Sequence, residues 1–249
     1  MRIHRFGTTP EDAIYAAEQP DGTFRRLEGQ LFTGLTATDE IVEAGPRLAP
    51  VDPWAVIGVA VNYSAHGAEM KRDGMGPGAR PPYPVYFLKL PSSVCGPDDP
   101  IVLPRHLRSD KVDFEAELAV VIGRRAKNVA AEDALNYVLG YSCANDVTAR
   151  DWQKEWGGGQ FCRGKGMDHF CPLGPCLVTV DDPAVADLAS LRVRGSLNGE
   201  VMQDAPAGDM LFNVPELIAF ISGSTTLEPG TVILTGTPSG VGMARTPPR

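Results

Sequence analysis

The sequence predicts an α+β protein that is predominantly β. Short apolar runs such as residues 54–61, 84–89 and 231–235 recur along the chain and are bounded by proline, glycine or aspartate. Runs of this length and composition are typical of buried strands. Only a few stretches, residues 131–139 among them, repeat apolar residues at helical spacing. Strands interrupted by a few short helices indicate a mixed, β-rich fold.

Length and composition allow one large domain with a small appendage. The chain has 249 residues, of which 43% are hydrophobic and 22% are charged, as in an ordinary soluble globular protein. A chain of this length can bury a substantial core. We predict a small β-rich N-terminal unit at residues 1–52, with a structural role, and a main domain at residues 53–249 that carries the chemistry.

The net charge of −8 and the isoelectric point near 5.0 argue against a protein that binds nucleic acid or anionic membranes. A small anionic substrate remains compatible, because a few cationic groups can make a local positive pocket. No run of about 18 apolar residues exists, and the N-terminus lacks the apolar run of a signal peptide. We therefore expect a cytoplasmic protein, whose five cysteines are reduced thiols rather than a disulfide framework or a zinc site.

The first elements are expected to be strands. Residues 13–17 and 23–27 flank Pro20-Asp21-Gly22, whose residue types suit a tight turn, so they predict a β-hairpin. After a proline-bounded link, residues 54–61 have the composition of a buried strand.

His66 and Glu69 follow that strand with a spacing of three, which places both on one face of a helical turn. A carboxylate beside an imidazole orients the ring and raises its basicity, as a general base requires. An ordinary surface pair would have the same spacing. The next segment, residues 70–84, is rich in glycine and proline and is either a surface loop or a lid that closes over a ligand.

Three carboxylates stand at the centre of the chain. Residues 84–89 predict another core strand, and residues 111–123 alternate before becoming continuously apolar, as in a strand that enters a core. Residues two apart in a strand face the same side, so Glu115 and Glu117 point the same way. A cation between them would remove their repulsion, whereas a solvated strand face would need none. The third carboxylate is Asp146.

Residues 131–139 predict a helix that Gly140 ends, and residues 141–145 return as a strand leading to Asp146. The segment at 157–160 predicts a flexible loop with neither phosphate-binding spacing nor a helical pattern after it. Lys165 lies between two glycines, where the backbone can approach a ligand closely; the alternative is a solvated surface lysine.

The last third predicts a hairpin, a helix and a strand. Asn198-Gly199 is a strong hairpin turn signal, and residues 214–221 predict a helix with Pro215 in its first turn. Residues 231–235 predict a core strand that opens into Gly236-Thr237-Pro238.

Five of these segments together resemble the fumarylacetoacetate hydrolase family. They are Asn62-Tyr63-x-x-His66-x-x-Glu69, Asp113-Phe114-Glu115-Ala116-Glu117-Leu118, Asn145-Asp146-Val147-Thr148-Ala149-Arg150-Asp151-Trp152-Gln153, Gly164-Lys165-x-x-Asp168 and Leu234-Thr235-Gly236-Thr237-Pro238. Each motif is weak alone, but all five occur in sequence order within residues 55–249. The resemblance implies a mixed β-roll, with residues 53–249 as the catalytic domain.

The resemblance also implies the roles of individual residues. The metal ligands would be Glu115, Glu117 and Asp146, binding one Mg²⁺ for which Mn²⁺ or Ca²⁺ could substitute. The catalytic residues would be His66 as base, Glu69 orienting it, and Lys165 stabilising an oxyanion or enolate. The residues that hold the substrate would be Arg150, Gln153 and Thr237. Three hard oxygen ligands suit Mg²⁺ on general grounds as well.

The implied activity is hydrolysis of a C–C bond in a small 2-oxo or 1,3-diketo acid of the acylpyruvate or fumarylacetoacetate type. Decarboxylation, tautomerisation or hydration of a 2-oxo dioic acid such as oxaloacetate would use the same site, because all these reactions pass through an enolate. A non-catalytic ligand-binding protein is a third hypothesis, which the presence of His66, Glu69 and Lys165 disfavours. By resemblance alone we expect a homodimer.

Two features depart from the family pattern. His169 follows Asp168 where relatives often have a small polar residue, which would place an imidazole near the pocket or packed on the outside. The sequence also ends at Arg249, where relatives usually continue, so we expect either a shortened C-terminal end or a tail that lies beyond this sequence.

Overall fold

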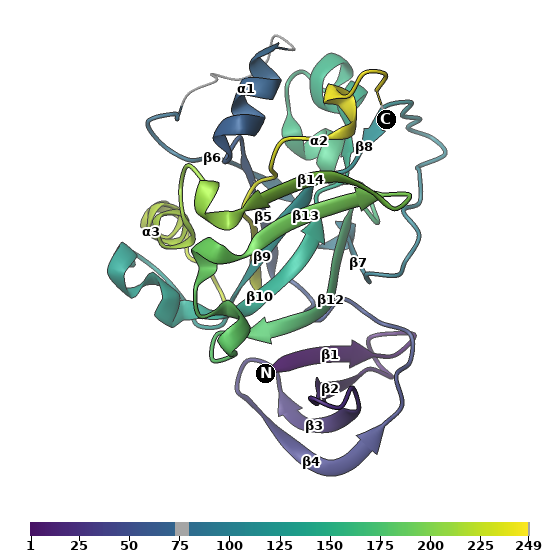
Figure 1. Ribbon diagram of the computed structural model, residues 1–249, viewed down its shortest axis with the longest axis vertical. Coiled ribbons are helices and arrows are strands. Elements are labelled where there is room, and N and C mark those ends of the chain that lie inside the picture. Colours follow the sequence, from purple (N-terminus) through teal and green to yellow (C-terminus); the bar gives the residue numbers. More distant parts are fainter. Residues whose placement is uncertain (73–79, 249) are drawn as a thin grey trace.

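The computed structural model describes residues 1–72 and 80–248 and is dominated by strands (Figure 1). In chain order the strands are β1 (Arg2–Phe6), β2 (Ile14–Glu18), β3 (Phe24–Gln30), β4 (Gly34–Val42), β5 (Ala55–Ala60), β6 (Val85–Lys89), β7 (Val94–Cys95), β8 (Val112–Asp113), β9 (Ala116–Ile122), β10 (Val138–Asn145), β11 (Thr148–Ala149), β12 (Cys171–Thr179), β13 (Arg192–Leu197), β14 (Glu200–Pro206) and β15 (Thr231–Leu234). The α-helices are α1 (Ser64–Arg72), α2 (Phe161–Lys165) and α3 (Val214–Ser224). Short turns include the 3₁₀ helix η2 (Ala131–Tyr137) and the π-helical turn η3 (Trp152–Trp156). The predicted predominantly β fold class is confirmed.

One mixed sheet of eleven strands organises the molecule. Its order is β4-β3-β2-β1-β12-β10-β9-β15-β5-β6, with β7 paired to β12 off this path. Most neighbours are antiparallel, whereas β15 and β5 run parallel, as do β12 and β7. The parallel pair brings the carboxyl ends of β5 and β15 to the same edge of the sheet.

The N-terminal strands β1–β4 form a meander at the bottom of Figure 1, and β1 joins them to the main sheet by pairing with β12. The predicted hairpin is present as β2 and β3, whose turn is closed by the Gly22 N–H donating to the Gln19 carbonyl. Strands β1 and β4 were not predicted. Ile3 and Leu27 of this unit belong to the same buried cluster as Val121 and Leu173, so the meander shares a core with the main sheet.

Strand β9 is buried on both faces and divides the core. Leu118, Val120 and Ile122 pack in the cluster that contains the apolar side of α3, while Ala119 and Val121 pack in the cluster on the other face. Two-residue alternation therefore puts Glu117 on the same side as Ala119 and Val121.

Three sequence predictions of secondary structure need correction. Strand β6 exists but is the last strand of the sheet rather than a core strand, and Val85 and Leu88 are more than half exposed. The helix predicted at 131–139 is the 3₁₀ helix η2, which ends at Tyr137, and Gly140 lies inside β10. A Cβ at Gly140 would meet the Val178 carbonyl oxygen at 2.3 Å, so close strand packing, not a helix stop, requires this glycine.

Two further differences bear on the site. The strand predicted at 111–123 is interrupted at residues 114 and 115, because β8 pairs with β11 while β9 enters the main sheet. The loop at 157–160 is followed by the short helix α2, which was not predicted. The possible lid at 70–84 includes residues 73–79, which lie outside the described residues.

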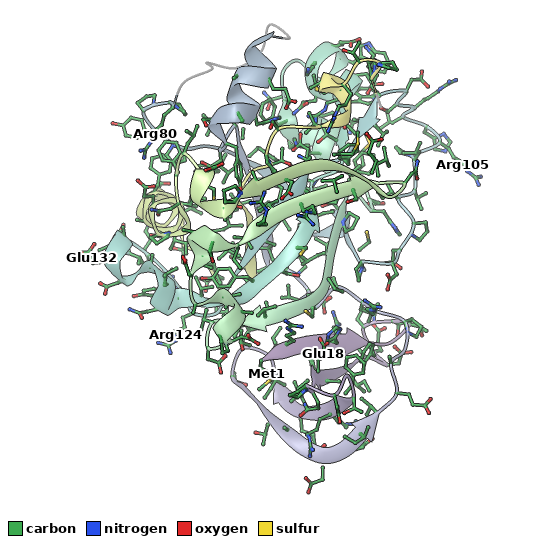
Figure 2. The ribbon with its side chains drawn as sticks, in the orientation of Figure 1. Met1, Glu18, Arg80, Arg105, Arg124 and Glu132 are labelled. Atoms are coloured by element: carbon green, nitrogen blue, oxygen red, sulfur yellow. The ribbon has the colours of Figure 1, made fainter. Side chains whose placement is uncertain are left out.

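The predicted hairpin and C-terminal helix are confirmed. Asn198 and Gly199 both have positive φ between β13 and β14, as a two-residue hairpin loop requires. Helix α3 begins with a capping box between Asn213 and Glu216. Figure 2 shows charged side chains such as Arg105, Arg124 and Glu132 at the periphery, where they are exposed. Charged groups buried in the interior therefore stand out against this pattern.

Candidate active site

The register of β9 and β10 brings the three carboxylates together. Glu117 is paired with Ala144, and the Asp146 N–H donates to the Glu115 carbonyl at 2.8 Å just beyond the last strand pair. All three carboxylates are buried, and one oxygen from each lies within 4.8 Å of the others. The predicted cluster of Glu115, Glu117 and Asp146 is therefore present, and the solvated strand face is excluded.

Lys165 neutralises two of these carboxylates. Its Nζ donates to Glu115 Oε2 at 2.8 Å, to Asp146 Oδ2 at 2.6 Å and to Thr148 Oγ1 at 2.7 Å. The lysine is the last residue of α2 and is buried, so the alternative of a solvated surface lysine is wrong. Burial lowers the pKa of Lys165, but Asp146 and Glu115 outweigh it, so the pKa is raised and the group stays an ammonium.

Arg150 holds the other side of Glu115. Its Nη1 lies 2.7 Å from Glu115 Oε1 and donates to Gln153 Oε1 at 3.1 Å, while Nε donates to Asp113 Oδ2 at 2.9 Å. Nη2 is buried and lies 2.8 Å from Asp113 Oδ2, but in a geometry that makes no hydrogen bond. Most N–H groups of the guanidinium are therefore bonded to the protein. Among the described residues, Nη2 has no hydrogen-bond partner.

The two glutamates differ in protonation. Burial opposes ionisation of Glu115, but Lys165 and Arg150 outweigh it and lower its pKa to about 2. Among the described residues, no cation is paired with Glu117; burial, Asp146 and Glu115 raise its pKa well above the ordinary value. A cation among the three carboxylates would supply Glu117 with the missing counter-charge.

His66 and Glu69 form the predicted pair on α1. The Nδ1 of His66 lies 3.1 Å from Glu69 Oε2, and both side chains are buried, so the surface-pair alternative is wrong. With its proton on Nδ1 held by the carboxylate, the ring leaves Nε2 free to accept another. Glu69 is held in turn by the Gly240 N–H, which donates to its Oε1 at 3.0 Å.

Parallel pairing of β5 with β15 places α1 beside the loop that follows β15. In this loop the Gly236 N–H donates to Glu117 Oε2 at 2.7 Å. Gly236 has φ of +94°, and a Cβ there would lie 2.7 Å from the Asn62 Cβ, so the turn requires glycine. The Asn62 amide ties the same loop to the chain before α3 through the Thr235 and Phe212 carbonyls.

A small cavity joins the base to one of the three carboxylates, Glu115, whereas Glu117 and Asp146 do not line it. The space open to the centres of water molecules is about 30 Å³. Its lining includes six of the predicted site residues: His66, Glu115, Arg150, Gln153, Lys165 and Thr237. The hydroxyl of Thr237 is committed to protein partners, since it donates to the Ala116 carbonyl at 2.8 Å and accepts from Gln203 Nε2 at 2.6 Å. The catalytic and substrate-binding roles of these residues remain predictions.

Several residues of the site were missed by sequence reasoning. The ammonium of Lys89, at the end of β6, donates to Asp146 Oδ1 at 2.7 Å. Phe87 lines the cavity beneath Lys165, whose Nζ lies 5.1 Å from the ring centroid. Val61 also lines the cavity with φ of +52°, which is rare for a β-branched residue. The position of Lys89 at the end of an apolar strand was the one sequence signal for its role in the site. Nothing in the sequence distinguished Phe87 or Val61 from ordinary core residues.

His169 is not part of the cavity. Its Nδ1 lies 3.0 Å from the Pro100 carbonyl, and it borders two hollows on the outer side of α2 and β7. Of the two sequence interpretations, packing on the outside is the one that the structure supports.

The donor set fits a hard divalent cation. Three buried carboxylates converge, and each has one oxygen in contact with Arg150, Gly236 or Lys89. The second oxygens of Glu115 and Asp146 accept from the single ammonium of Lys165. Such all-oxygen sites bind Mg²⁺, Mn²⁺ or Ca²⁺. A metal site is therefore compatible with the structure, while the identity of the ion stays a prediction.

Comparison with known proteins identifies the family. The family model described as "Fumarylacetoacetate (FAA) hydrolase C-terminal" matches residues 55–249. The chain belongs to the fumarylacetoacetate hydrolase family. The resemblance seen in the five motifs is thereby confirmed, and the protein is a member of a family of enzymes.

Curated relatives with similar sequences include oxaloacetate tautomerases. The mitochondrial oxaloacetate tautomerase FAHD2A of Bos taurus is 42% identical over 247 residues, covering 97% of this chain and 73% of the relative. The Homo sapiens protein of the same name is 46% identical, covering 81% of this chain and 61% of the relative. A fumarylacetoacetate hydrolase domain-containing protein 2 homolog of Dictyostelium discoideum is 42% identical, with 80% of this chain and 65% of the relative covered. The chain thus spans about two thirds of the length of these relatives.

Solved structures of the same fold carry names of two reaction types. A 5-carboxymethyl-2-hydroxymuconate delta-isomerase from Mycobacterium smegmatis has a TM-score of 0.81 at 37% identity, covering 97% of this chain and 90% of that chain. A fumarylacetoacetate hydrolase from the psychrophile Exiguobacterium antarcticum has a TM-score of 0.80 at 37% identity, covering 100% and 91%. Isomerases and a hydrolase therefore share this architecture.

Among the described residues, no helix has the length and apolar character needed to cross a membrane. The tautomerase relatives are named as mitochondrial proteins, so the comparisons do not single out the cytoplasmic location expected from the sequence. That location and the homodimer stay predictions.

Proposed function

We propose that the protein is a metal-dependent tautomerase that interconverts the enol and keto forms of a small 2-oxo dicarboxylic acid such as oxaloacetate. One observation carries the proposal: His66, Lys165 and Glu115 line a single buried cavity. A base, an acid and a cation site around one small cavity are the groups that enolisation requires.

The base is the Nε2 atom of His66. Glu69 holds the proton on Nδ1 and, as a carboxylate, stabilises the imidazolium that forms when Nε2 takes a proton from the carbon beside the 2-oxo group. Glu69 is itself fixed by the Gly240 N–H. The base therefore keeps its orientation through the proton transfer.

Lys165 supports the developing negative charge on the substrate oxygen. Its ammonium is buried beside the carboxylates, where an electrostatic contact is stronger than in water. A divalent cation held by Glu115, Glu117 and Asp146 would supply Lewis-acid polarisation of the 2-oxo group. In the ketonising direction the proton moves from the enol oxygen to the carbon, so no atom is lost and no water is consumed.

The substrate is expected to be small and anionic. Two cationic side chains, Arg150 and Lys165, line the cavity, and the space in it that is open to the centres of water molecules is only about 30 Å³, which favours a compact acid. Among the described residues, Arg150 Nη2 is a buried donor without a hydrogen-bond partner, although it lies 2.8 Å from Asp113 Oδ2 in an ion pair. Gln153 lies beside Arg150 on the cavity wall. A substrate carboxylate would satisfy this donor.

The alternative is the C–C hydrolase expected from the sequence. A hydrolase would use His66 to activate water, and a structural neighbour at 37% identity is named a fumarylacetoacetate hydrolase. The tautomerase is favoured because the oxaloacetate tautomerases of Bos taurus and Homo sapiens are 42% and 46% identical to this chain.

Supplying one pre-formed tautomer separates these reactions. Enol-oxaloacetate is mixed with the protein, with Mg²⁺ or after chelation, and the decay of the enol absorbance is followed in parallel with assays for pyruvate and carbon dioxide. A tautomerase accelerates the decay in a Mg²⁺-dependent way without releasing either product. Pyruvate from oxaloacetate would indicate a decarboxylase. In a parallel reaction with an acylpyruvate, cleavage of that substrate without accelerated decay of enol-oxaloacetate would indicate the hydrolase.

The matched control is Lys127→Met, because Lys127 is an exposed lysine whose Nζ donates to the Gly223 carbonyl of α3. This variant should keep the wild-type rate, whereas Lys165→Met should lose most of it at equal protein concentration.

A further inference from the structure

Lys89 is a buried lysine that does not line the active-site cavity. Its side chain is 0% exposed, although it stands at the end of the edge strand β6. Its Nζ donates to Asp146 Oδ1 at 2.7 Å, to the Phe170 carbonyl at 3.0 Å and to the Lys165 carbonyl. An ammonium has three N–H groups, so these three acceptors use all of them.

At each of the three carboxylates, a different protein donor contacts one oxygen. Arg150 holds Glu115 Oε1, the Gly236 N–H holds Glu117 Oε2, and Lys89 holds Asp146 Oδ1. Each carboxylate is thus fixed at one oxygen by its own donor. The second oxygens of Glu115 and Asp146 both accept from Lys165 Nζ, so a cation among the carboxylates would share these two oxygens with that ammonium.

This arrangement limits how the carboxylates can bind a cation. A carboxylate whose one oxygen accepts a strong, charge-assisted hydrogen bond has fewer lone pairs left on that oxygen and binds a cation preferentially through the other one. Three single-oxygen ligands match Mg²⁺, which requires six ligands in near-ideal octahedral geometry and keeps several waters. Ca²⁺ takes six to eight oxygens and often uses both oxygens of a carboxylate, which these donors oppose.

We propose that Lys89 is a positioning residue that makes the site selective for Mg²⁺ over Ca²⁺ by restricting Asp146 to one oxygen. The inference rests on the metal dependence of the proposed function but concerns binding of the cation alone. Lys89 acts through Asp146 and touches neither the cavity nor a substrate within it.

Lys89 is the donor at which this idea can be tested. Arg150 lines the cavity, so a change there would also alter substrate binding, and the Gly236 donor is a backbone group that substitution cannot remove. Lys89 also bonds the carbonyl of Lys165, so one ammonium fixes both a metal ligand and the end of α2.

The test is titration of the chelated protein with MgCl₂ and with CaCl₂ by calorimetry, without substrate, for wild type and Lys89→Met. Wild type should bind Mg²⁺ more tightly than Ca²⁺. Loss of a positive charge strengthens attraction for both ions alike, so the ratio of the two dissociation constants reports the coordination mode. Because partners of metal ligands typically change affinity by 10–100-fold, the ratio Kd(Ca²⁺)/Kd(Mg²⁺) should fall about tenfold in Lys89→Met.

A ratio within about threefold of wild type, with the fold retained by circular dichroism, would overturn the proposal. The control is Lys127→Met, because Lys127 is exposed and its Nζ donates to the Gly223 carbonyl. This variant should leave the ratio unchanged. If Lys89→Met does not fold, the wild-type titration decides, because Ca²⁺ binding as tight as Mg²⁺ binding also contradicts the proposal. Neither result depends on turnover, so a failure of the tautomerase assay is a separate outcome.

Discussion

The site contains two buried ionic regions that are built in different ways. The acid cluster of Glu115, Glu117 and Asp146 draws its partners from β6, α2 and the loop after β15, far apart in the sequence. The His66–Glu69 pair comes from one turn of α1, and its described contact outside the helix is the Gly240 N–H. The first region is a product of sheet topology, and the second is a product of local helical spacing.

This difference separates cation binding from proton transfer. In the acid cluster, carboxylates are compensated by buried cations, so a change there alters charge balance and stability. In the helical pair, an imidazole is oriented by one carboxylate, so a change there removes a base while leaving the cluster intact. The two regions should therefore respond independently to mutation, apart from groups that contact both.

Replacing the base should have the largest effect on rate. General acid–base catalysis contributes about 10²–10⁴-fold, so His66→Ala should lower kcat/KM for enol-oxaloacetate by that amount. The Mg²⁺-induced rise in Tm should persist, because His66 is not a carboxylate of the acid cluster. Stopped-flow absorbance and thermal unfolding measure the two effects. Unchanged turnover in this variant would refute the assignment of the base.

Removing one carboxylate of the acid cluster should remove the Mg²⁺-induced rise in Tm, which His66→Ala should keep. Glu117→Gln should abolish the Mg²⁺-dependent stabilisation, which for a protein at 100 times the Kd amounts to about 2.7 kcal/mol. At about 2–4 °C per kcal/mol for a chain of this size, that is a lost Tm shift of roughly 5–10 °C. The metal-free variant should be at least as stable as wild type at neutral pH, since a buried carboxyl without a cation partner has been replaced. An undiminished shift with Mg²⁺ would remove Glu117 from the metal site.

The two glutamates should give the metal-free protein opposite pH responses. Glu117 has a raised pKa in the folded state, so its contribution to stability is present below about 4.5, its ordinary pKa, and is lost as pH rises through the raised value. Glu115 has a folded pKa of about 2, so its contribution is present above 4.5 and is lost as pH falls toward 2. Urea unfolding across pH in chelator measures both. Glu117→Gln should remove the loss on the alkaline side only; the same loss in this variant would assign it to another group.

Gly236 holds one carboxylate of the acid cluster through its backbone N–H and should show an intermediate effect. Gly236→Ala forces a side chain into φ of +94° and against Asn62, so it should destabilise the protein by more than about 1 kcal/mol and weaken Mg²⁺ binding. The matched control is Gly223→Ala in α3, where a Cβ meets nothing within 4 Å and the change should stabilise by up to about 1 kcal/mol. Equal Tm values for the two variants would show that the turn does not need glycine.

His169 should have the smallest effect. His169→Ala removes a side chain that borders neither the acid cluster nor the cavity, so stability should change by no more than about 0.5 kcal/mol and kcat/KM by no more than about twofold. Steady-state kinetics and thermal unfolding provide the check. A changed substrate preference in this variant would bring His169 back into the site.

The helical pair and the carboxylates could be predicted because their signals are local. A spacing of three places His66 and Glu69 together on any helix, and a spacing of two places Glu115 and Glu117 on one face of any strand. The five ordered motifs supplied Asp146 and Lys165. These predictions needed no knowledge of which strands are neighbours.

The remaining features depend on long-range packing and were missed. The apolar run of β6 has the composition of a core strand, and only the sheet order shows that it lies at the edge with its last residue turned inward. Lys89 therefore looked like a polar strand end. Gly140 looked like a helix stop, but its real constraint is the Val178 carbonyl on a neighbouring strand. In both cases the deciding partner comes from elsewhere in the chain.

The most direct test of the tautomerase is deuterium exchange at the methylene of keto-oxaloacetate in D₂O, followed by NMR at saturating Mg²⁺. The account predicts that wild-type protein accelerates exchange well above the uncatalysed rate. His66→Ala should return exchange to about that background without loss of bound Mg²⁺. Wild-type exchange that does not exceed the background, or exchange that His66→Ala leaves undiminished, would contradict it.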